Sequence, residues 1–402
     1  MQAFSSTKAL IKTFSKNFLL IPCIYSFYSL ASSNDISVNG FYTIDATYAE
    51  KNVELIGTAQ PSRDLDASDI QFSNSLIGAQ LNYQINDNLF LSILGDISLT
   101  PRDEVETNIS WAYIGYDFGD DLMARVGQLQ TPLLKGTELR TIGISRIWAR
   151  PIIPGNGSSG FNDFVGLDLV KKNSSGQHHW MFQGGIGKAE HEQSQMIDGK
   201  SMTYVAAQYQ YQDFWLRTAL VNAQYEFKTL DERVIDDNAS INMLSMESEY
   251  AFNSITVNVG GSIGQSDQSP EDSMAYASLN YPLGDITPYV YVSYRAQDVK
   301  PLDVEGDDSQ QPNDNRPPPP DGDRPPTDGN RPPPPEQPLN RPAPPLDNEI
   351  VSWSVGARWF WSESTVVKAQ FELLNKDSIN NDGVVQNSNK GNLITLTIEG
   401  IF

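Results

Sequence analysis

The chain is poor in cysteine, histidine and basic side chains. Its 402 residues include one cysteine, Cys23, and three histidines, and 28 Lys plus Arg stand against 50 Asp plus Glu. A single cysteine excludes a disulfide framework and a zinc site built on cysteine. The formal net charge of −22, with no basic stripe, excludes a nucleic-acid binder, because phosphate contacts require clustered Lys and Arg.

Long apolar runs are also missing. After Ser37 no run of 18 apolar residues occurs, which excludes helical membrane spans. The apolar stretch 18–31 is shorter, follows three lysines and precedes small residues, so it predicts a secretory signal peptide over 1–33, cleaved near Ala31 or Ser33. A retained anchor is the alternative, but 14 residues are too few to cross roughly 30 Å of hydrocarbon as a helix. Export without disulfides indicates a bacterial envelope protein.

The rest of the chain alternates between polar and apolar residues with a period of two. In 79–85, 352–359 and 367–373, every second side chain is apolar and its neighbours are small or polar. This alternation predicts strands with one apolar and one polar face. We expect sixteen of them, at about 37–49, 74–86, 89–100, 106–117, 121–132, 164–173, 178–188, 201–211, 214–227, 241–252, 255–265, 273–282, 286–298, 349–361, 365–377 and 391–402.

The connections between these strands fall into two sets. Tight turns, such as 86–88, 118–120 and 253–254, alternate with longer polar loops along the whole chain. An even number of strands with short periplasmic turns and longer extracellular loops is typical of a transmembrane antiparallel β-barrel. In a bilayer an open sheet edge would leave backbone groups unpaired, so the sheet must close. We therefore predict an all-β fold, one barrel of about sixteen strands over 34–402.

A secreted β-sandwich or an adhesin repeat is the alternative, since both also use short alternating strands. Two features favour the barrel. The last strand alternates Ile394, Leu396 and Ile398 with polar residues and ends in Phe402, which resembles the C-terminal signature of outer-membrane proteins. In addition, aromatic residues gather near the short-turn rim, as in the aromatic girdle of a membrane barrel: Tyr83, Tyr116, Phe118, Tyr211, Tyr250, Tyr281, Trp359 and Trp361.

One segment carries a family resemblance. Residues 124–132 read Ala-Arg-Val-Gly-Gln-Leu-Gln-Thr-Pro and are followed by Trp-Ala-Arg-Pro at 148–151 and Gly-Leu-Asp at 166–168. This is similar to the place in Gram-negative sixteen-stranded porins where a strand carrying Arg-x-Gly-(Arg/Gln) enters the long third loop. The whole mature chain resembles these general or substrate-diffusion porins. Gln128 and Gln130 depart from the family, which usually has more basic residues there.

The resemblance implies several further properties. The third loop, 132–163, is expected to fold into the lumen and form the pore constriction; a loop draped over the outer mouth is the alternative. It also implies a homotrimer, and small lipid-facing residues such as Gly40 and Ala46 would allow close packing of its subunits. A further implication is that the barrel assembly machinery recognises Phe402. The other expected partners are outer-membrane lipid and lipopolysaccharide.

A barrel of sixteen to eighteen strands encloses an aqueous channel. The predicted function is therefore a porin for passive diffusion of small hydrophilic solutes and ions in the bacterial outer membrane. Charge selectivity should be weak. The distant acidic loops would attract cations, but screening over roughly 8 Å reduces their effect on ions at the constriction. The side chains expected at the constriction and lumen wall are charged: Arg125, Lys135, Glu138, Arg140, Arg146, Arg150, Asp117, Asp168, Arg217, Arg295, Arg358 and Lys368.

A proline-rich loop interrupts the pattern at 299–348. Its part 312–345 holds 15 of the chain's 25 prolines, which cannot donate in a strand ladder, so polyproline II or unstructured chain is expected on the extracellular side. It either shields the pore mouth or binds a partner. The acidic loops at 231–232 and 303–308 suggest divalent cations that bridge to lipopolysaccharide phosphates; no other cofactor is expected.

The two other functional classes are an enzyme and a non-conducting barrel. An enzyme is not expected, because His178 and His179 lie beside a short turn and no Ser-His-acid or metal-ligand grouping is recognisable. The main alternative to a porin is a non-conducting or loop-plugged receptor or structural barrel, with the proline-rich loop as its binding element.

Overall fold

The structure is a computed structural model of the whole chain. It describes residues 35–50, 53–55, 63–65, 70–72, 75–99, 105–139, 141–150, 163–190, 197–228, 234–267, 271–298, 347–379 and 385–402. The predicted signal peptide and almost all of the proline-rich loop lie outside these residues. Within the described ranges, no helix has the length and apolar character needed to cross a membrane.

The described residues are almost entirely strand. The long strands are β1 (Ile36–Ala49), β5 (Leu76–Gln84), β6 (Leu89–Leu99), β7 (Val105–Gly119), β8 (Leu122–Gln130), β9 (Asp163–Ser175), β10 (His178–Glu190), β11 (Ile197–Tyr211), β12 (Phe214–Lys228), β13 (Val234–Phe252), β14 (Ile255–Ser266), β15 (Glu271–Asn280), β16 (Ile286–Asp298), β17 (Asp347–Ser362), β18 (Thr365–Ile379) and β19 (Val385–Ile401). Short strands β2 (Val53–Leu55), β3 (Arg63–Leu65) and β4 (Ile70–Gln71) follow β1, and two single-turn 3-10 helices, η2 (Thr137–Leu139) and η3 (Gly143–Ser145), follow β8.

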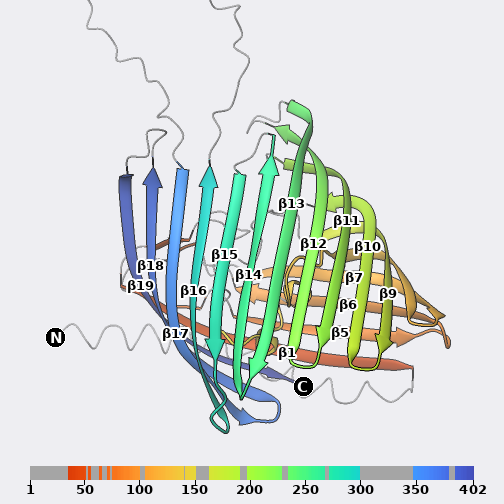
Figure 1. Cartoon of the computed structure of the whole chain (residues 1–402), viewed down its shortest axis with the longest axis horizontal. Helices are drawn as coiled ribbons and strands as arrows, with labels where there is room; N and C mark the ends of the chain where they lie inside the picture. Colours follow the sequence, from red (N-terminus) through yellow and green to blue (C-terminus); the bar gives the residue numbers. More distant parts are fainter. Residues whose placement is uncertain are drawn as a thin grey trace, which may run out of the picture.

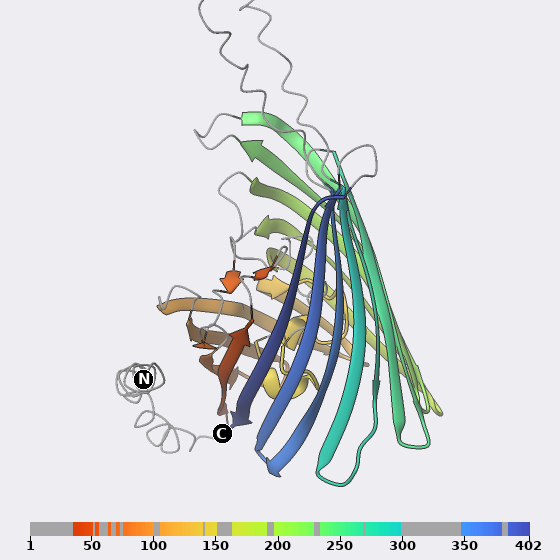
Figure 2. The same cartoon turned by 90° about the vertical axis from the view of Figure 1, so that its left-hand side faces the viewer.

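These sixteen long strands form one closed antiparallel barrel. Each pairs with its neighbour in sequence, and β1 pairs with both β5 and β19, so the sheet has no open edge. The closing seam continues to the last residue, because the backbones of Gly40 and Phe402 exchange two hydrogen bonds of 2.7 and 2.9 Å. Figures 1 and 2 show the tall wall of β14–β19 facing the lower wall of β5–β8. The predicted sixteen-stranded barrel is confirmed.

Tight hairpins join the strands at one rim. Asp120 and Asp121 between β7 and β8 have φ of 51° and 60°, and Asn253 and Ser254 between β13 and β14 have φ of 45° and 73°. Two consecutive residues with positive φ match the right-handed twist of the flanking strands. The short-turn rim is thus specified locally by polar residues that tolerate this conformation.

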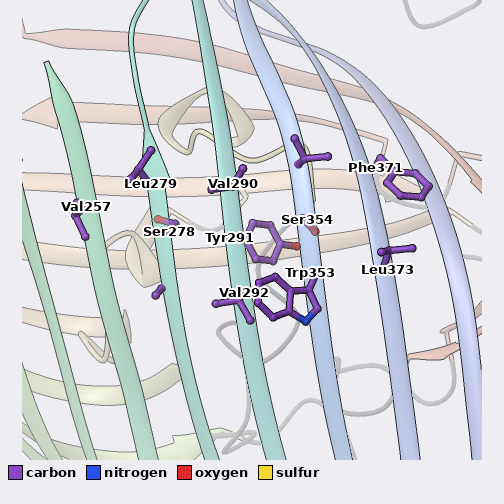
Figure 3. Close-up of a pocket in the computed structure, with 12 residues that line it drawn as sticks. Val257, Ser278, Leu279, Val290, Tyr291, Val292, Trp353, Ser354, Phe371 and Leu373 are labelled. Atoms are coloured by element: carbon purple, nitrogen blue, oxygen red, sulfur yellow. The ribbon is translucent and has the colours of Figure 1, made fainter.

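The outer face of the barrel is apolar and ringed by aromatic side chains at the short-turn rim. All eight aromatic residues predicted for the girdle are exposed, from Tyr211 at 37% to Trp361 at 63%. Trp359 and Trp361 stack with centroids 6.1 Å apart. The outer surface of β14–β18 carries a groove of about 590 Å³ between side chains such as Val257, Leu279 and Trp353 (Figure 3). It opens outward from the wall and does not belong to the lumen.

Several strands extend further toward the long-loop rim than expected. β13 begins at Val234, seven residues before the predicted start, and β19 begins at Val385, six before. A transmembrane strand needs only about 9–11 residues, whereas β13 has 19. Near the loop-side ends of β12 and β13 polar side chains appear on the outer face, where Asn222 donates a hydrogen bond of 2.8 Å to Asn242. The ends of these strands therefore rise beyond the apolar band.

Toward the loop-side ends of β11–β13 the inner face of the barrel is apolar, which alternation alone did not predict. Inward side chains of β10–β13, β15 and β16 form a buried cluster with residues of β8, β9 and the start of the third loop. The cluster comprises Leu129, Leu133, Leu134, Phe164, Ala189, Met202, Tyr204, Val221, Ala223, Tyr225, Ala239, Ile241, Met243, Met274, Tyr276, Tyr289 and Tyr291. The two faces of β11–β13 therefore exchange character along each strand. Near the short turns the outer face is apolar and the inner face is polar. Near the long loops the outer face is polar and the inner face is apolar.

Candidate pore lumen and third loop

The third loop begins on the inner wall of β12 and β13. Leu133 and Leu134 are buried in the apolar cluster. The Leu133 carbonyl accepts a hydrogen bond of 2.7 Å from the Ser245 hydroxyl, and the Lys135 amide donates one of 2.5 Å to the Glu247 carboxylate. These bonds fix the backbone of the first loop residues against the wall.

Two ion pairs continue this first anchor. The Lys135 ammonium lies 2.5 Å from the Glu249 carboxylate, and the Arg217 guanidinium lies 3.3 Å from the Glu138 carboxylate. Lys135 also stands 5.2 Å from the centroid of the Trp215 ring. The loop side chains of both pairs are partly exposed, so water screens them.

The loop meets the wall a second time at β18 and β19. The Lys368 ammonium donates to the backbone carbonyls of Gly143, Arg146 and Trp148, at 2.9, 2.8 and 3.2 Å. The same ammonium lies 2.5 Å from the Glu399 carboxylate, and both side chains are fully buried. Burial lowers the pKa of the Arg146 guanidinium, while the carboxylates of Glu399 and Asp45 act in the opposite direction.

The end of the described loop lies against β16 and β18. The Ala149 amide donates to the Tyr289 hydroxyl at 3.1 Å and to the Gln370 side-chain oxygen at 3.2 Å, and the Arg150 amide approaches the same oxygen at 3.3 Å. The Arg150 guanidinium lies 3.7 Å from the Glu372 carboxylate. The contacts of residues 141–150 with β16, β18 and β19 therefore form a second anchor of the loop.

The two anchors lie on different parts of the wall. The first involves β12 and β13, and the second involves β16, β18 and β19. Every wall residue in them faces inward, so the described part of the loop lies inside the barrel and runs across it. Figure 2 shows this segment, in yellow, between the walls. Residues 151–162 and Arg140, which was predicted at the constriction, lie outside the described residues.

A separate charged cluster joins the two strands that carry the loop. Asp168 accepts hydrogen bonds from the Arg125 guanidinium at 2.9 and 2.5 Å, from the Gln183 amide at 2.8 Å and from the Tyr204 hydroxyl at 2.8 Å. Arg125 also stands 5.2 Å from the Tyr113 ring centroid. Arg125 and Asp168, predicted from the resemblance, are thus brought together below the loop.

The remaining predicted residues are spread around the lumen. Arg295 forms a two-pronged, buried pair with Asp272 on the neighbouring strand. Arg358 stacks on Phe360, with 4.5 Å to the ring centroid, and no carboxylate of the described residues lies within ion-pair distance of it. Asp117 lies at the short-turn rim, where its carboxylate accepts the Gly119 amide at 2.8 Å, so it stabilises a turn and is far along the strand from the loop anchors.

Sequence reasoning did not select several residues that hold the loop. Four inward-facing residues that contact the loop were not predicted from the sequence: Glu399, Gln370, Tyr289 and Ser245. Glu399 was the most accessible to prediction, because it is the one charged residue among the inward threonines of the last strand. The apolar cluster had no comparable signal, since on β11–β13 both faces carry apolar residues.

The two histidines that the structure describes contact neighbouring tyrosine and serine side chains. The His178 ring lies 2.8 Å from the Tyr209 hydroxyl and stacks on Tyr211, and the His179 ring lies 2.9 Å from the Ser174 hydroxyl. Both stand next to the β9–β10 turn. Among the described residues, no three His, Cys, Asp or Glu side chains are grouped so as to hold a metal ion. His191 lies outside those residues.

No protein-family model and no curated protein matches the chain. Solved structures do match. The anion-selective porin from Comamonas acidovorans gives a TM-score of 0.55 at 12% identity, over 91% of this chain and 99% of that chain. The outer membrane channel DcaP of Acinetobacter baumannii gives 0.55 at 11% identity, over 92% and 97%. OmpT, an outer membrane protein of Vibrio cholerae that is also solved in a trimer form, gives 0.53 at 11% identity, over 93% and 99%.

These likenesses extend over the whole barrel and concern its architecture. The chain has the fold of the sixteen-stranded outer-membrane porins. Together with the exposed apolar band and aromatic girdle, this fold makes it an outer-membrane β-barrel, as predicted.

Proposed function

We propose that the protein is a porin, a water-filled channel for passive diffusion of small hydrophilic solutes and ions. The observation that carries the proposal is the combination of strand number and inner-face chemistry. Sixteen strands enclose more space than wall side chains can fill, and the inner wall carries charged residues on many strands. Charged side chains in a membrane protein face a water-filled cavity or one another.

Weak charge selectivity is part of this proposal. Six cations of the inner wall and the loop each lie within 4 Å of a carboxylate: Arg125, Lys135, Arg150, Arg217, Arg295 and Lys368. A compensated pair has little field beyond its own length, especially when salt screens it. These pairs support a constriction near the third loop that sorts ions by size more than by sign.

A loop-plugged barrel is the competing candidate, and one observation favours it. Many inward side chains are almost inaccessible to solvent, among them Asp45, Lys368, Glu372 and Glu399. Such burial supports a lumen that is filled on the third-loop side at this depth. If the remaining passage were also closed, the barrel would serve as a receptor or a structural protein, with the proline-rich loop as its binding element.

Planar-bilayer conductance of the refolded mature protein separates these candidates. We expect stepwise open-channel currents and a small reversal potential under a salt gradient. Neutralising Arg125, Arg140, Arg146 and Arg150 in turn should move ion preference toward cations. Lys171→Gln, at an exposed position on the β9 side of the short-turn rim, is the control and should leave both readouts unchanged. Absence of current from a folded, heat-modifiable barrel would establish the plugged form.

The remaining proposals concern partners. A homotrimer is supported by the trimer form of the Vibrio cholerae barrel. Gly40 is not an open packing surface, because the Phe402 ring covers it. The position of Phe402 at the closing seam supports its recognition during barrel assembly.

The acidic loops 231–232 and 303–308 are proposed to bind divalent cations that bridge to lipopolysaccharide. Unchanged stability of the barrel after chelation of divalent cations would contradict this. No enzymatic activity is proposed.

A further inference from the structure

We infer that Lys368 is the positioning residue of the third loop: it clasps the loop backbone to the inner wall and does not itself meet the permeating solute. This inference rests on the proposed channel function for its consequence, since the position of the loop then determines the width of the passage. It follows from four contacts of one ammonium group, from the shape of the loop at Gly143, and from the location of the partners on the wall.

The ammonium of Lys368 is an unusual group in this barrel. It is completely buried, although a lysine inside a protein normally keeps its charge in water. An ammonium has three donors, and here four acceptors surround it: the Glu399 carboxylate and the carbonyls of Gly143, Arg146 and Trp148. All its hydrogen-bonding capacity is therefore used inside the protein, and none remains for an ion in the passage.

The three carbonyls belong to one short stretch of the loop. Gly143 opens η3, and Arg146 and Trp148 follow it; the Gly143 carbonyl also accepts the Arg146 amide at 3.1 Å. A cation at this position satisfies them together and is favoured by their dipoles. A neutral side chain could not bond three acceptors from one atom, so the chemistry of a lysine is what the loop requires here.

The loop is also shaped to fit the wall at this point. A side-chain carbon added to Gly143 would lie 2.6 Å from the Glu399 carboxyl carbon and 2.7 Å from the Thr43 hydroxyl. Both wall residues are buried, so neither can move aside without disturbing its neighbours. The backbone of the loop thus touches the wall directly, and only glycine permits this approach.

The partners of the clasp lie on the strands that close the barrel. Lys368 is on β18, Glu399 on β19 and Thr43 on β1, and Thr43 pairs with Glu399 across the closing seam. The β18–β19 pairing brings Glu399 to Lys368, and the closing seam places Thr43 beside them. The loop is therefore held where the first and last strands meet.

The test uses a charge-balanced pair of substitutions. Lys368→Met together with Glu399→Gln removes the clasp without changing net charge or leaving a lone buried carboxylate. In a Cys23→Ser background, Ala149→Cys reports loop release, because Ala149 is only 3% exposed, and a small methanethiosulfonate reagent measures its accessibility. Ser145→Cys, at an exposed loop position, is the control for reagent entry. Single-channel recording of the same barrels reports the passage.

We expect the double variant to raise the modification rate of Ala149→Cys at least about ten-fold and to broaden the open-channel current, while Ser145→Cys reacts at an unchanged rate. Equal rates and equal current noise in folded barrels with and without the clasp would overturn the inference. If the double variant does not fold, Gly143→Val tests the same contact from the loop side and should give the same release. A silent but folded wild type would contradict the channel proposal alone, because the thiol measurement still decides whether Lys368 holds the loop.

Discussion

The two anchors of the third loop solve the same problem with different chemistry. The first anchor, at β12 and β13, buries Leu133 and Leu134 and adds ion pairs whose loop partners, Lys135 and Glu138, are partly exposed. The second, at β16, β18 and β19, packs Ile147 and Trp148 against the same cluster and adds the fully buried pair of Lys368 and Glu399. Both ends of the loop thus have apolar contacts, but only the second depends on a buried polar network.

The difference predicts how each anchor fails. Apolar contacts are non-directional, so a damaged first anchor can partly repack. A buried polar network is stable only when every member is satisfied, so removal of one member leaves the others unpaired at high cost. The second anchor should therefore be the more sensitive, and it should define the loop position more sharply.

The largest effect is expected for the single substitution Lys368→Met. It leaves the Glu399 carboxylate buried without its cation and three carbonyls without their donor. We expect a loss of about 3–5 kcal/mol in the free energy of unfolding, measured by urea titration in detergent micelles. Adding Glu399→Gln should restore part of this loss, because it removes the lone charge. A loss smaller than that of Leu134→Ala, the variant in the first anchor, would contradict the proposed difference between the two anchors.

A smaller effect is expected for Leu134→Ala in the first anchor. The truncation leaves a cavity in the apolar cluster that neighbouring side chains can partly fill, so we expect a loss of about 2–4 kcal/mol. The same urea titration measures it. Leu283→Ala, at an exposed position on the short-turn rim, is the matched control and should have little effect. Equal losses at both leucines would mean that the cluster does not hold the loop.

Lys135→Met tests the exposed part of the first anchor. The Lys135 side chain is 45% exposed and its partner Glu249 is partly exposed, so we expect a loss of only about 0.2–1 kcal/mol. High salt should abolish the difference from wild type, since it screens exposed pairs. A loss that persists in 1 M salt would show that this pair behaves like the buried one of the second anchor.

Arg358→Gln probes a lumen cation that belongs to neither anchor. Because no described carboxylate lies within ion-pair distance of it, its charge should act on passing ions. A unit charge pair 4 Å apart in water is worth about 1 kcal/mol, which limits the change in permeability ratio to about five-fold. We expect a reversal potential shifted toward cation preference, whereas Arg295→Gln together with Asp272→Asn should shift it less, because the two substitutions remove a compensated pair. The opposite ranking would show that pairing does not determine selectivity.

Local patterns were sufficient for the wall of the barrel and insufficient for the lumen. The alternation in 79–85 and 367–373 predicted strands, and the aromatic residues from Tyr83 to Trp361 predicted the girdle, because both are properties of neighbours in sequence. Strand ends were less accurate: β13 starts at Val234 and not near 241, because the side-chain alternation of a membrane strand does not continue into 234–240.

The candidate site shows the same division. Arg125, Asp168 and Lys368 were selected because they are charged and face inward, and all three lie on the inner wall. Their partners were not selected: the Gln183 and Tyr204 hydrogen bonds to Asp168, the loop carbonyls at Lys368 and the carboxylate of Glu399. Glu138 and Arg217 were both selected, but no pattern indicated that they would meet.

The sequence by itself determined the period-two strands, their number, the short turns and the two faces of the wall, because each depends on residues close together in the chain. Only the tertiary structure decided which inner charges are paired, where the third loop docks and which side of the lumen it fills. These depend on the register of a closed sheet, which brings Thr43 against Glu399 and Gly143 against Lys368 across more than two hundred residues of chain.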